Sequence, residues 1–310
     1  MKPFTLKDFQ QMFPDDATCL EWLKNQLYPD GIYCIKCEAV TKHHRVVSRP
    51  SYSCDRCGHH VHPTAETIFH KSPTPLTTWF YATYLMAQTR CGISAKQIQR
   101  ETGVTYKTAW RMFKQIRSML DENKPLGGRG RGVEMDEAYF GGKRKNGGGR
   151  RLRTDKGEQY KTVVLGIAER KGRIIATTAP DAKSATLLST VREFILPKST
   201  VFTDDYQCYD GVSRITERGY THKRINHSEK VYVMGDIHTN TVEGFWSLVK
   251  RGISGVYHQV GSHYLQSYLN EYTFRYNRRF DFQPMFISFL KQVEKRDAVV
   301  RRTPVHIEPF

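Results

Sequence analysis

Two pairs of cysteines constrain the first part of this chain more than any other feature of the sequence. Cys34 and Cys37 form one CxxC pair, Cys54 and Cys57 form a second, and the sixteen residues 38–53 separate them. This spacing lets four thiolates surround one tetrahedral Zn²⁺ ion. Polar and apolar residues alternate in part of this intervening stretch, as they do in β-strands. The stretch can therefore form a hairpin that brings the second cysteine pair back to the first. The pattern therefore predicts a zinc ribbon with structural Zn²⁺ held by Cys34, Cys37, Cys54 and Cys57.

A disulfide pair or a redox CxxC motif could use the same spacing. Seven cysteines make an odd number, and the first ten residues, MKPFTLKDFQ, contain no apolar secretion signal. No stretch approaches the roughly 18 to 20 consecutive apolar residues of a membrane span. These features favour zinc in a soluble, cytoplasmic protein without a membrane partner, associated with the nucleoid if the protein is bacterial.

The charge of the chain indicates its partner. Lys and Arg number 48 and Asp and Glu 31, so the formal net charge is 48 − 31 = +17 over 310 residues. An excess of this size favours a polyanion, with nucleic acid the first choice over a ribosomal or membrane surface.

A helical segment follows the cysteines and has the outline of a helix-turn-helix motif. Residues 76–90 form an apolar helical run, residues 93–101 form a short helix capped by Ser94, and Gly103 turns the chain into a second helix. An ordinary helical hairpin has the same outline. In a helix-turn-helix motif the start of the second helix meets base edges. The predicted base readers are Thr105, Tyr106, Lys107 and Thr108, and the predicted phosphate contacts are Lys107, Lys114 and Arg117.

A glycine-rich, basic stretch at 127–132 marks a boundary, and the whole chain is assigned to the α/β class. Five segments follow from these patterns. They are an N-terminal helix with the zinc ribbon (1–72), the helix-turn-helix region (73–126), the linker (127–132), a catalytic domain (133–298) and a tail (299–310).

The segment after the linker predicts an RNase H-like sheet that carries carboxylates. Strand-like runs at 132–137, 162–168 and 173–178 precede a helix at 182–195 and a strand at 199–203. Carboxylates at the ends of the first and fourth strands, Asp136 and Asp204, would then lie side by side. Glu134, Glu137 and Asp205 compete with them as neighbouring acids.

A third acid can come from a later helix. Asn240 or Thr241 is expected to cap this helix, which places Glu243 in its first turn and Lys250 seven residues later on the same face. Three carboxylates can hold two Mg²⁺ or Mn²⁺ ions for an in-line phosphoryl displacement. Lys250 is then available to contact DNA phosphate.

Several segments together resemble one family. These segments are GISAKQIQRETGVTYKTAWRM, VEMDEAYFGG, VFTDDYQCYD and the long HTNTVEGFWSLVKRGISGVYHQVGSHYLQSYLNEYTFRYNRR. They are similar to insertion-sequence transposases of the IS1595 family, the ISXO2-like group related to eukaryotic Merlin elements. The resemblance covers nearly the whole chain. It implies a mobile-element DDE-type transposase with an RNase H-like core, which binds element ends, cleaves DNA and transfers the new 3′ end to a target.

The resemblance also implies site residues. Asp136, Asp204 and Glu243 match the three acids, and Lys250 matches the lysine that follows them. Some members of the family use Asn in place of the last acid, so the resemblance implies Asn240 and His238 as alternative ligands. Arg275, Arg278 and Arg279 form a basic cluster expected to meet phosphate. At least a homodimer is expected, because two element ends must be held together.

Two other functions fit part of the pattern. A zinc-ribbon and helix-turn-helix regulator would use the same N-terminal half with a C-terminal domain that only oligomerises. A stand-alone metal-dependent nuclease, or a resolvase-like enzyme, would use the same acids. The order of the acids on strands and helix argues against the regulator, and strand joining separates a transposase from a nuclease.

Overall fold

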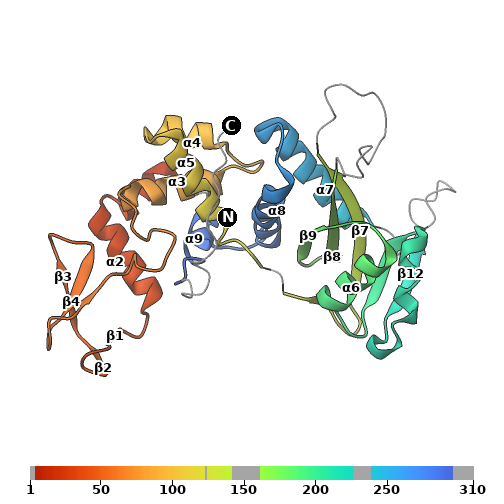
Figure 1. Cartoon of the computed structure of the whole chain (residues 1–310), viewed down its shortest axis with the longest axis horizontal. Helices are drawn as coiled ribbons and strands as arrows, with labels where there is room; N and C mark the ends of the chain where they lie inside the picture. Colours follow the sequence, from red (N-terminus) through yellow and green to blue (C-terminus); the bar gives the residue numbers. More distant parts are fainter. Residues whose placement is uncertain (1–3, 123, 142–160, 226–238, 296–310) are drawn as a thin grey trace. The chain divides into compact units, whose positions relative to one another are not determined.

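A computed structural model describes residues 4–122, 124–141, 161–225 and 239–295 (Figure 1). The chain divides into two compact units. The first combines Met1–Met119 with Phe282–Phe310, and the second is Leu120–Asp281. No helix among the described residues is long and apolar enough to cross a membrane.

The helices of unit 1 pack around an aromatic core. They are α1 (Leu6–Met12), α2 (Asp16–Leu27), α3 (Leu76–Gln88), α4 (Ala95–Thr102), α5 (Tyr106–Arg117) and α9 (Met285–Leu290). Phe13 lies edge-on to Phe80 at 4.9 Å and to Phe286 at 5.8 Å between ring centroids. Such edge-to-face pairs add to the free energy that burial of the rings provides. The core of unit 1 therefore joins α1, α3 and α9, which are far apart in the sequence.

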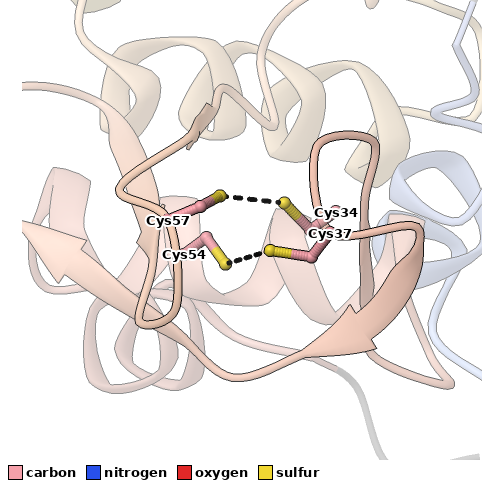
Figure 2. Close-up of side chains that lie close together, drawn as sticks. All are labelled: Cys34, Cys37, Cys54 and Cys57. Carbon is pink, nitrogen blue, oxygen red and sulfur yellow. Dashed lines mark hydrogen bonds between the residues drawn. The ribbon is translucent and has the colours of Figure 1, made fainter.

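The cysteine-rich segment forms short strands. β1 (Ile32–Cys34) pairs with β2 (Ala39–Thr41), and β4 (Ser51–Cys54) pairs with β3 (His43–Val46) and β5 (His60–Val61), all antiparallel. The four predicted thiols converge between these hairpins (Figure 2). Gly58, after the second pair, has φ +70°, a conformation that glycine adopts without strain.

The domain boundaries predicted from the sequence differ from those of the two units. Residues 282–295 were assigned to the catalytic domain, but Phe286 of α9 packs against Phe9 and Phe13 in unit 1. The glycine-rich stretch is not a free linker either. Leu126 and Gly127 form β6, which pairs with β10 (Ile195–Leu196) inside unit 2. Apolar side chains decide both boundaries, since Leu126 and Phe286 are buried.

Unit 2 is built on a five-stranded sheet in the order β12-β11-β7-β8-β9. These strands are β7 (Gly132–Phe140), β8 (Thr162–Glu169), β9 (Ile174–Ala179), β11 (Thr200–Asp204) and β12 (Thr221–Ile225). β7, β8 and β9 form an antiparallel meander, whereas β11 runs parallel to both β7 and β12. Helix α6 (Ser184–Phe194) supplies the crossover from β9 to β11. The chain between β11 and β12 forms three 3₁₀ turns, at Gln207–Tyr209, Val212–Arg214 and Thr216–Arg218.

Helices cover both faces of this sheet. Val133 and Met135 of β7 join a buried cluster with Leu187 and Val191 of α6. Residues of the opposite parity, including Ala138 and Phe140, face a second cluster built by α7 (Asn240–Gly252) and α8 (Ser262–Asn277). A π-helical turn, Ile253–Tyr257, follows α7. Because side chains alternate along a strand, β7 presents even-numbered residues to α7 and odd-numbered residues to α6.

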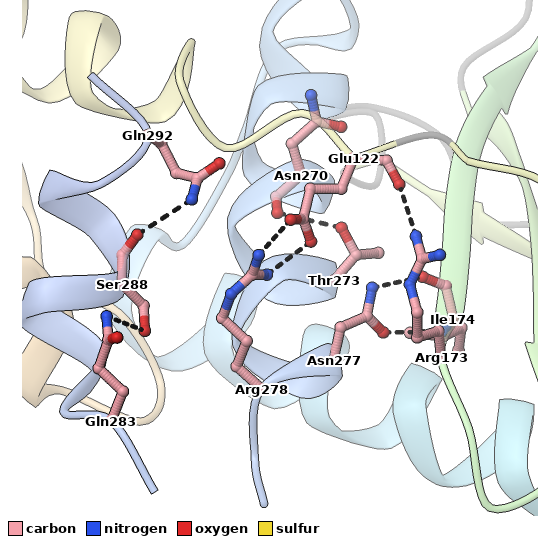
Figure 3. A network of polar contacts seen from close by, with 10 residues as sticks. All are labelled: Glu122, Arg173, Ile174, Asn270, Thr273, Asn277, Arg278, Gln283, Ser288 and Gln292. Carbon is pink, nitrogen blue, oxygen red and sulfur yellow. Dashed lines mark hydrogen bonds and ion pairs between the residues drawn. The ribbon is translucent and has the colours of Figure 1, made fainter. Parts of the chain in front are cut away.

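Side-chain amides of α8 bind the edge strand β9. Gln266 accepts a hydrogen bond from the Thr178 amide (2.7 Å) and donates one to the Ala176 carbonyl (2.9 Å). Asn277 accepts from the Ile174 amide (2.7 Å) and donates to the Ile174 carbonyl (3.0 Å). Figure 3 shows the Asn277 pair beside the ion pair of Arg278 with Glu122. These contacts attach α8 to the sheet.

A close approach at Gly166 allows α7 to pack against β8. A Cβ atom added at Gly166 would lie 2.4 Å from Trp246 Cζ2 and 2.8 Å from Val242 Cγ2. We expect Gly166→Ala to destabilise the folded chain by about 1–3 kcal/mol, because overpacking forces the helix to shift. Thermal and urea unfolding of the full chain measure this effect.

Gly244→Ala is the matched control, since nothing lies within 4 Å of a Cβ at that helical position. Alanine there should leave stability unchanged or raise it by about 0.5–1 kcal/mol. Equal stability of the Gly166→Ala variant and the wild type would contradict this packing.

Candidate active site and metal centre

Strand pairing brings the first two predicted acids together. β11 runs parallel to β7 with Val201 opposite Val133 and Phe202 opposite Glu134. The paired residues end there, and Asp136 and Asp204 each follow the last pair by two residues on their own strands. Both aspartates are even-numbered, as are the β7 residues that face α7, so the alternation of side chains along a strand assigns them to that face of the sheet. The prediction that the ends of these two strands are neighbours agrees with the sheet order.

Asp136 lies in a half-buried site that disfavours its charged form. Trp246 Nε1 of α7 donates a hydrogen bond to Asp136 Oδ2 at 3.0 Å. Burial, followed by the negative charges of Glu137 and Asp204, raises the pKa of Asp136 to about 7, and the Trp246 hydrogen bond opposes this increase. The negative charge of Asp204 therefore acts on Asp136.

The third predicted acid lies on the helix that reaches Asp136. Glu243 is in the first turn of α7, three residues before Trp246, so both occupy one side of the helix. Its side chain is exposed and accepts a hydrogen bond from Thr239 Oγ1 at 2.7 Å. Asn240 and Lys250 are also exposed on α7. His238, the other alternative ligand, lies outside the described residues.

The acids are less tightly gathered than the cysteines. In the part of the chain that the structure describes, the possible metal ligands whose donor atoms all lie within 4.8 Å of one another are the four thiols. Asp136 and Asp204 share an edge of one face, and Glu243 comes from the helix above it. The arrangement is a set of hard oxygen donors on rigid elements, open to solvent at Glu243.

The competing acids have other partners. Glu137 points to the α6 face, where Tyr209 donates a hydrogen bond to Glu137 Oε2 at 2.7 Å. Asp205 is exposed, with Arg224 at 3.9 Å. Glu134 is completely buried and accepts hydrogen bonds from the Thr241 amide (2.8 Å) and the Val242 amide (3.2 Å).

This last contact corrects the predicted helix cap. Asn240 or Thr241 was expected to cap α7, but the helix begins at Asn240 with Thr239 in the cap position and no capping bond from the Thr239 side chain. Glu134, more than a hundred residues earlier, binds the first amides of the helix instead. Sequence patterns detect local caps only, so this contact could not have been found from the sequence.

The four thiols lie within 4.8 Å of one another and could hold one metal ion. The Sγ atoms of Cys34 and Cys57 are 3.5 Å apart, and those of Cys37 and Cys54 are 3.9 Å apart. Four ligands at a Zn–S distance of about 2.3 Å would be about 3.8 Å apart, which these distances bracket. A hydrogen bond from Thr41 lowers the pKa of Cys54 to about 6, whereas contact with Cys57 raises the pKa of Cys37 to about 12. Four crowded thiols cannot all ionise unaided, and a cation relieves this repulsion.

The predicted DNA-reading helix is formed and exposed at its start. Helix α4 ends at Thr102, and Gly103, whose φ is +71°, turns the chain toward α5. Thr105 caps α5 by accepting a hydrogen bond from the Thr108 amide. Thr105 and Lys107 are exposed, and Tyr106 and Thr108 are half-buried. Ala109, Met112 and Ile116 form the buried stripe on the other side of the helix.

Several of the arginines predicted to contact phosphate have partners within the protein. Arg117 is only 1% exposed, because it extends the buried stripe of α5 and its guanidinium lies 3.6 Å from the Phe113 ring centroid. Arg275 is buried and pairs with Glu271 at 2.5 Å. Arg278 forms an ion pair with Glu122, as Figure 3 shows. Burial disfavours phosphate contact for Arg117 and Arg275, whereas Arg278 and Arg279 are half-buried, and Arg279 lies over the Tyr276 ring.

Sequence reasoning missed a basic groove in unit 1. It has a volume of about 660 Å³ and runs from the β3–β4 hairpin to the start of α3. Its cationic and imidazole side chains are Arg45, Arg49, His62, His70 and Lys71, and Asp16 is its acid. The residues are scattered through 45–71, so no local motif could have identified the groove.

Comparison with known proteins identifies the family. The profile of the ISXO2-like transposase domain matches residues 125–277, nearly all of unit 2. A Halobacterium salinarum protein, described as an uncharacterized protein in transposable element ISH50, is 30% identical over 243 residues, 73% of this chain and 79% of the relative. A Haemophilus influenzae protein, described as an uncharacterized transposase-like protein, is 32% identical over 129 residues, 42% of this chain and 99% of the relative. The chain belongs to the IS1595 family of insertion-sequence transposases, the ISXO2-like group.

Proposed function

We propose that this protein is a DDE-type transposase that binds element ends, hydrolyses a phosphodiester at each end and transfers the freed 3′-hydroxyl to target DNA. Asp136, Asp204 and Glu243 are its catalytic acids. The observation that carries the proposal is the parallel pairing of β7 with β11, the two strands that bear Asp136 and Asp204. The hydrogen bond from Trp246 to Asp136 adds support, because Trp246 lies on the helix that bears Glu243. The sheet order, with a three-stranded meander followed by two parallel strands, supports an RNase H-like core.

The donor set fits Mg²⁺ or Mn²⁺. Carboxylate oxygens are the ligands these hard cations prefer. Burial raises the pKa of Asp136, and the negative charges of Glu137 and Asp204 add to this increase; bound cations would favour the charged carboxylate. When bound, a pair of such ions activates the attacking oxygen and stabilises the leaving oxygen of an in-line displacement.

The protein's own groups orient the DNA. Asp136, Asp204 and Glu243 would hold the ions, and the exposed Lys250, on the helix that bears Glu243, would bind backbone phosphate. The side chains hold and orient without forming a covalent bond to DNA. Cleavage and joining both need one such site for each end, which supports at least a homodimer.

We propose unit 1 as the DNA-docking module. The exposed start of α5 would read bases through Thr105, Tyr106, Lys107 and Thr108, as in a helix-turn-helix motif, with Lys114 on phosphate. The groove with Arg45, Arg49 and Lys71 has the charge to hold a phosphodiester backbone. The zinc ribbon, with Zn²⁺ on the four cysteines, would fix the β3–β4 hairpin that forms one side of this groove.

Substitution of the acids tests the catalytic assignment. We expect Asp136→Asn, Asp204→Asn and Glu243→Gln each to reduce cleavage and strand transfer by about 100-fold or more, because the loss of a direct ligand should exceed that of an outer-shell partner. Binding to element ends should persist. The assay uses duplex oligonucleotides of the inverted repeats with Mg²⁺ or Mn²⁺.

Asn240→Ala is the control, since Asn240 is exposed on the same turn of α7. Full activity in Glu243→Gln with loss in Asn240→Ala would transfer the third ligand to Asn240. Cutting without joining by the wild type would identify a nuclease, and binding without cutting a regulator.

The raised pKa of Asp136 predicts a pH-dependent stability. The folded protein retains a proton on Asp136 up to about pH 7, whereas an unfolded aspartate releases it near pH 3.9. Between these values the folded state binds more protons, so this carboxyl lowers stability as pH rises through 7. Without added Mg²⁺, Asp136→Asn should therefore raise the melting temperature more at pH 8 than at pH 5. A difference independent of pH would contradict the described environment.

The zinc assignment has a direct test. Metal analysis of the full chain should find one Zn²⁺, and Cys37→Ser should lower its affinity and the hydrogen-exchange protection of β1–β5. Cys91→Ser is the control because Cys91 is exposed and lies outside the cluster. Full zinc occupancy and unchanged protection in Cys37→Ser would rule out a four-thiolate site.

A further inference from the structure

A buried ionic cluster lies beneath the proposed catalytic acids. Glu134 Oε2 accepts hydrogen bonds from the amides of Thr241 (2.8 Å) and Val242 (3.2 Å) at the start of α7. Glu134 Oε1 accepts from Thr241 Oγ1 (3.0 Å) and from Arg170 Nε (3.1 Å). The Glu134 side chain is 0% exposed. These partners of the buried carboxylate all belong to unit 2.

Arg170 extends the cluster to a third strand. Its guanidinium carbon lies 3.7 Å from the centroid of the Phe202 ring on β11, and its amide donates to the Gly132 carbonyl of β7 (3.0 Å). The carboxylate meets both the positive end of a helix and a guanidinium, so its burial is electrostatically compensated. Removing the charge would leave Arg170 and the helix amides with weaker acceptors.

Each proposed catalytic acid follows a residue of this cluster by two positions in the sequence. Asp136 follows Glu134 by two residues on β7, and Asp204 follows Phe202 by two residues on β11, so each pair shares a face of its strand. Glu243 follows Thr241 by two residues in the first turn of α7. One set of contacts therefore fixes the three backbone segments that carry the acids.

We propose that Glu134 is the positioning residue of the active site: its buried carboxylate fixes the start of α7 on β7 and so sets Glu243 at the edge occupied by Asp136 and Asp204. The inference rests on the proposed function. Glu134 acts through these segments and is not a ligand or a catalytic residue. Gly166 contributes by letting Trp246 and Val242 approach the sheet, which brings the helix within reach of Glu134.

Three variants and a control test this role in the full, zinc-loaded chain. Glu134→Gln removes the charge and keeps the shape, Glu134→Asp keeps the charge and shortens the reach, and Thr241→Val removes the hydroxyl donor alone. Glu169→Gln is the control, because Glu169 is also a buried acid paired with an arginine, Arg131, but it lies on the opposite face of the sheet from α7.

Binding of Tb³⁺ provides a readout independent of DNA chemistry. Tb³⁺ is a hard cation, and Trp246 lies beside Asp136, so excitation of tryptophan should sensitise the luminescence of ion bound there. The signal of Asp136→Asn is subtracted as background. Melting temperature, binding to element ends and the Mn²⁺ concentration that gives half-maximal cleavage are measured in parallel.

We expect Glu134→Gln to weaken Tb³⁺ binding by about 10- to 100-fold and to raise the required Mn²⁺ concentration, with end binding unchanged. Glu134→Asp should recover part of the affinity, and Thr241→Val should lose a smaller part. Glu169→Gln should lower the melting temperature without changing Tb³⁺ affinity.

Unchanged Tb³⁺ affinity in folded Glu134→Gln would overturn the inference, as would equal weakening by Glu169→Gln. If Glu134→Gln does not fold, unchanged affinity in both Thr241→Val and Glu134→Asp overturns it. A wild type that binds Tb³⁺ at Asp136 but neither cuts nor joins DNA would refute the proposed function alone, with the positioning role then decided by the Tb³⁺ affinities.

Discussion

The pairing of β11 with β7 is the constraint on which the rest of unit 2 depends. A parallel neighbour requires a crossover, and α6 supplies it with Leu187 and Val191 packed on one face of the sheet. This leaves the opposite face to α7 and α8. The register of the pair then decides which side chains meet, since a slip of one residue would send Asp204 to the face of α6.

Packing and charge act together on the α7 face. Gly166 provides the space, Trp246 reaches Asp136, and Glu134 binds the helix amides. Burial, followed by the negative charges of Glu137 and Asp204, disfavours the charged form of Asp136 and raises its pKa. The surrounding fold must therefore offset the cost of holding these acidic groups near one another. Burial of Val242, Phe245 and Val249 against the sheet contributes to the free energy of folding that offsets it.

The sequence was sufficient for features that depend on local spacing. Four cysteines, the turn at Gly103 and the meander of β7, β8 and β9 were predicted from short patterns, and the sheet order places the first and fourth strands together as expected. Long-range contacts were beyond such patterns. The helix cap from Glu134, the packing of Phe286 in unit 1 and the ion pair of Arg278 with Glu122 each join residues more than a hundred positions apart. Arginines illustrate the difference. The sequence reveals their charge, but it does not reveal whether the guanidinium already pairs with a carboxylate or packs against an aromatic ring.

The side-chain amides of Gln266 and Asn277 on α8 affect how copies of this protein can associate. An edge strand ordinarily offers a row of backbone groups on which another strand can add. On β9 the alternating residues Ile174, Ala176 and Thr178 instead give backbone groups to Gln266 and Asn277. That side of the sheet is therefore protected against strand addition and against the aggregation it can start. Strand addition to this five-stranded sheet is therefore directed away from β9, whose side-chain partners on α8 already occupy the backbone groups that a second copy would need.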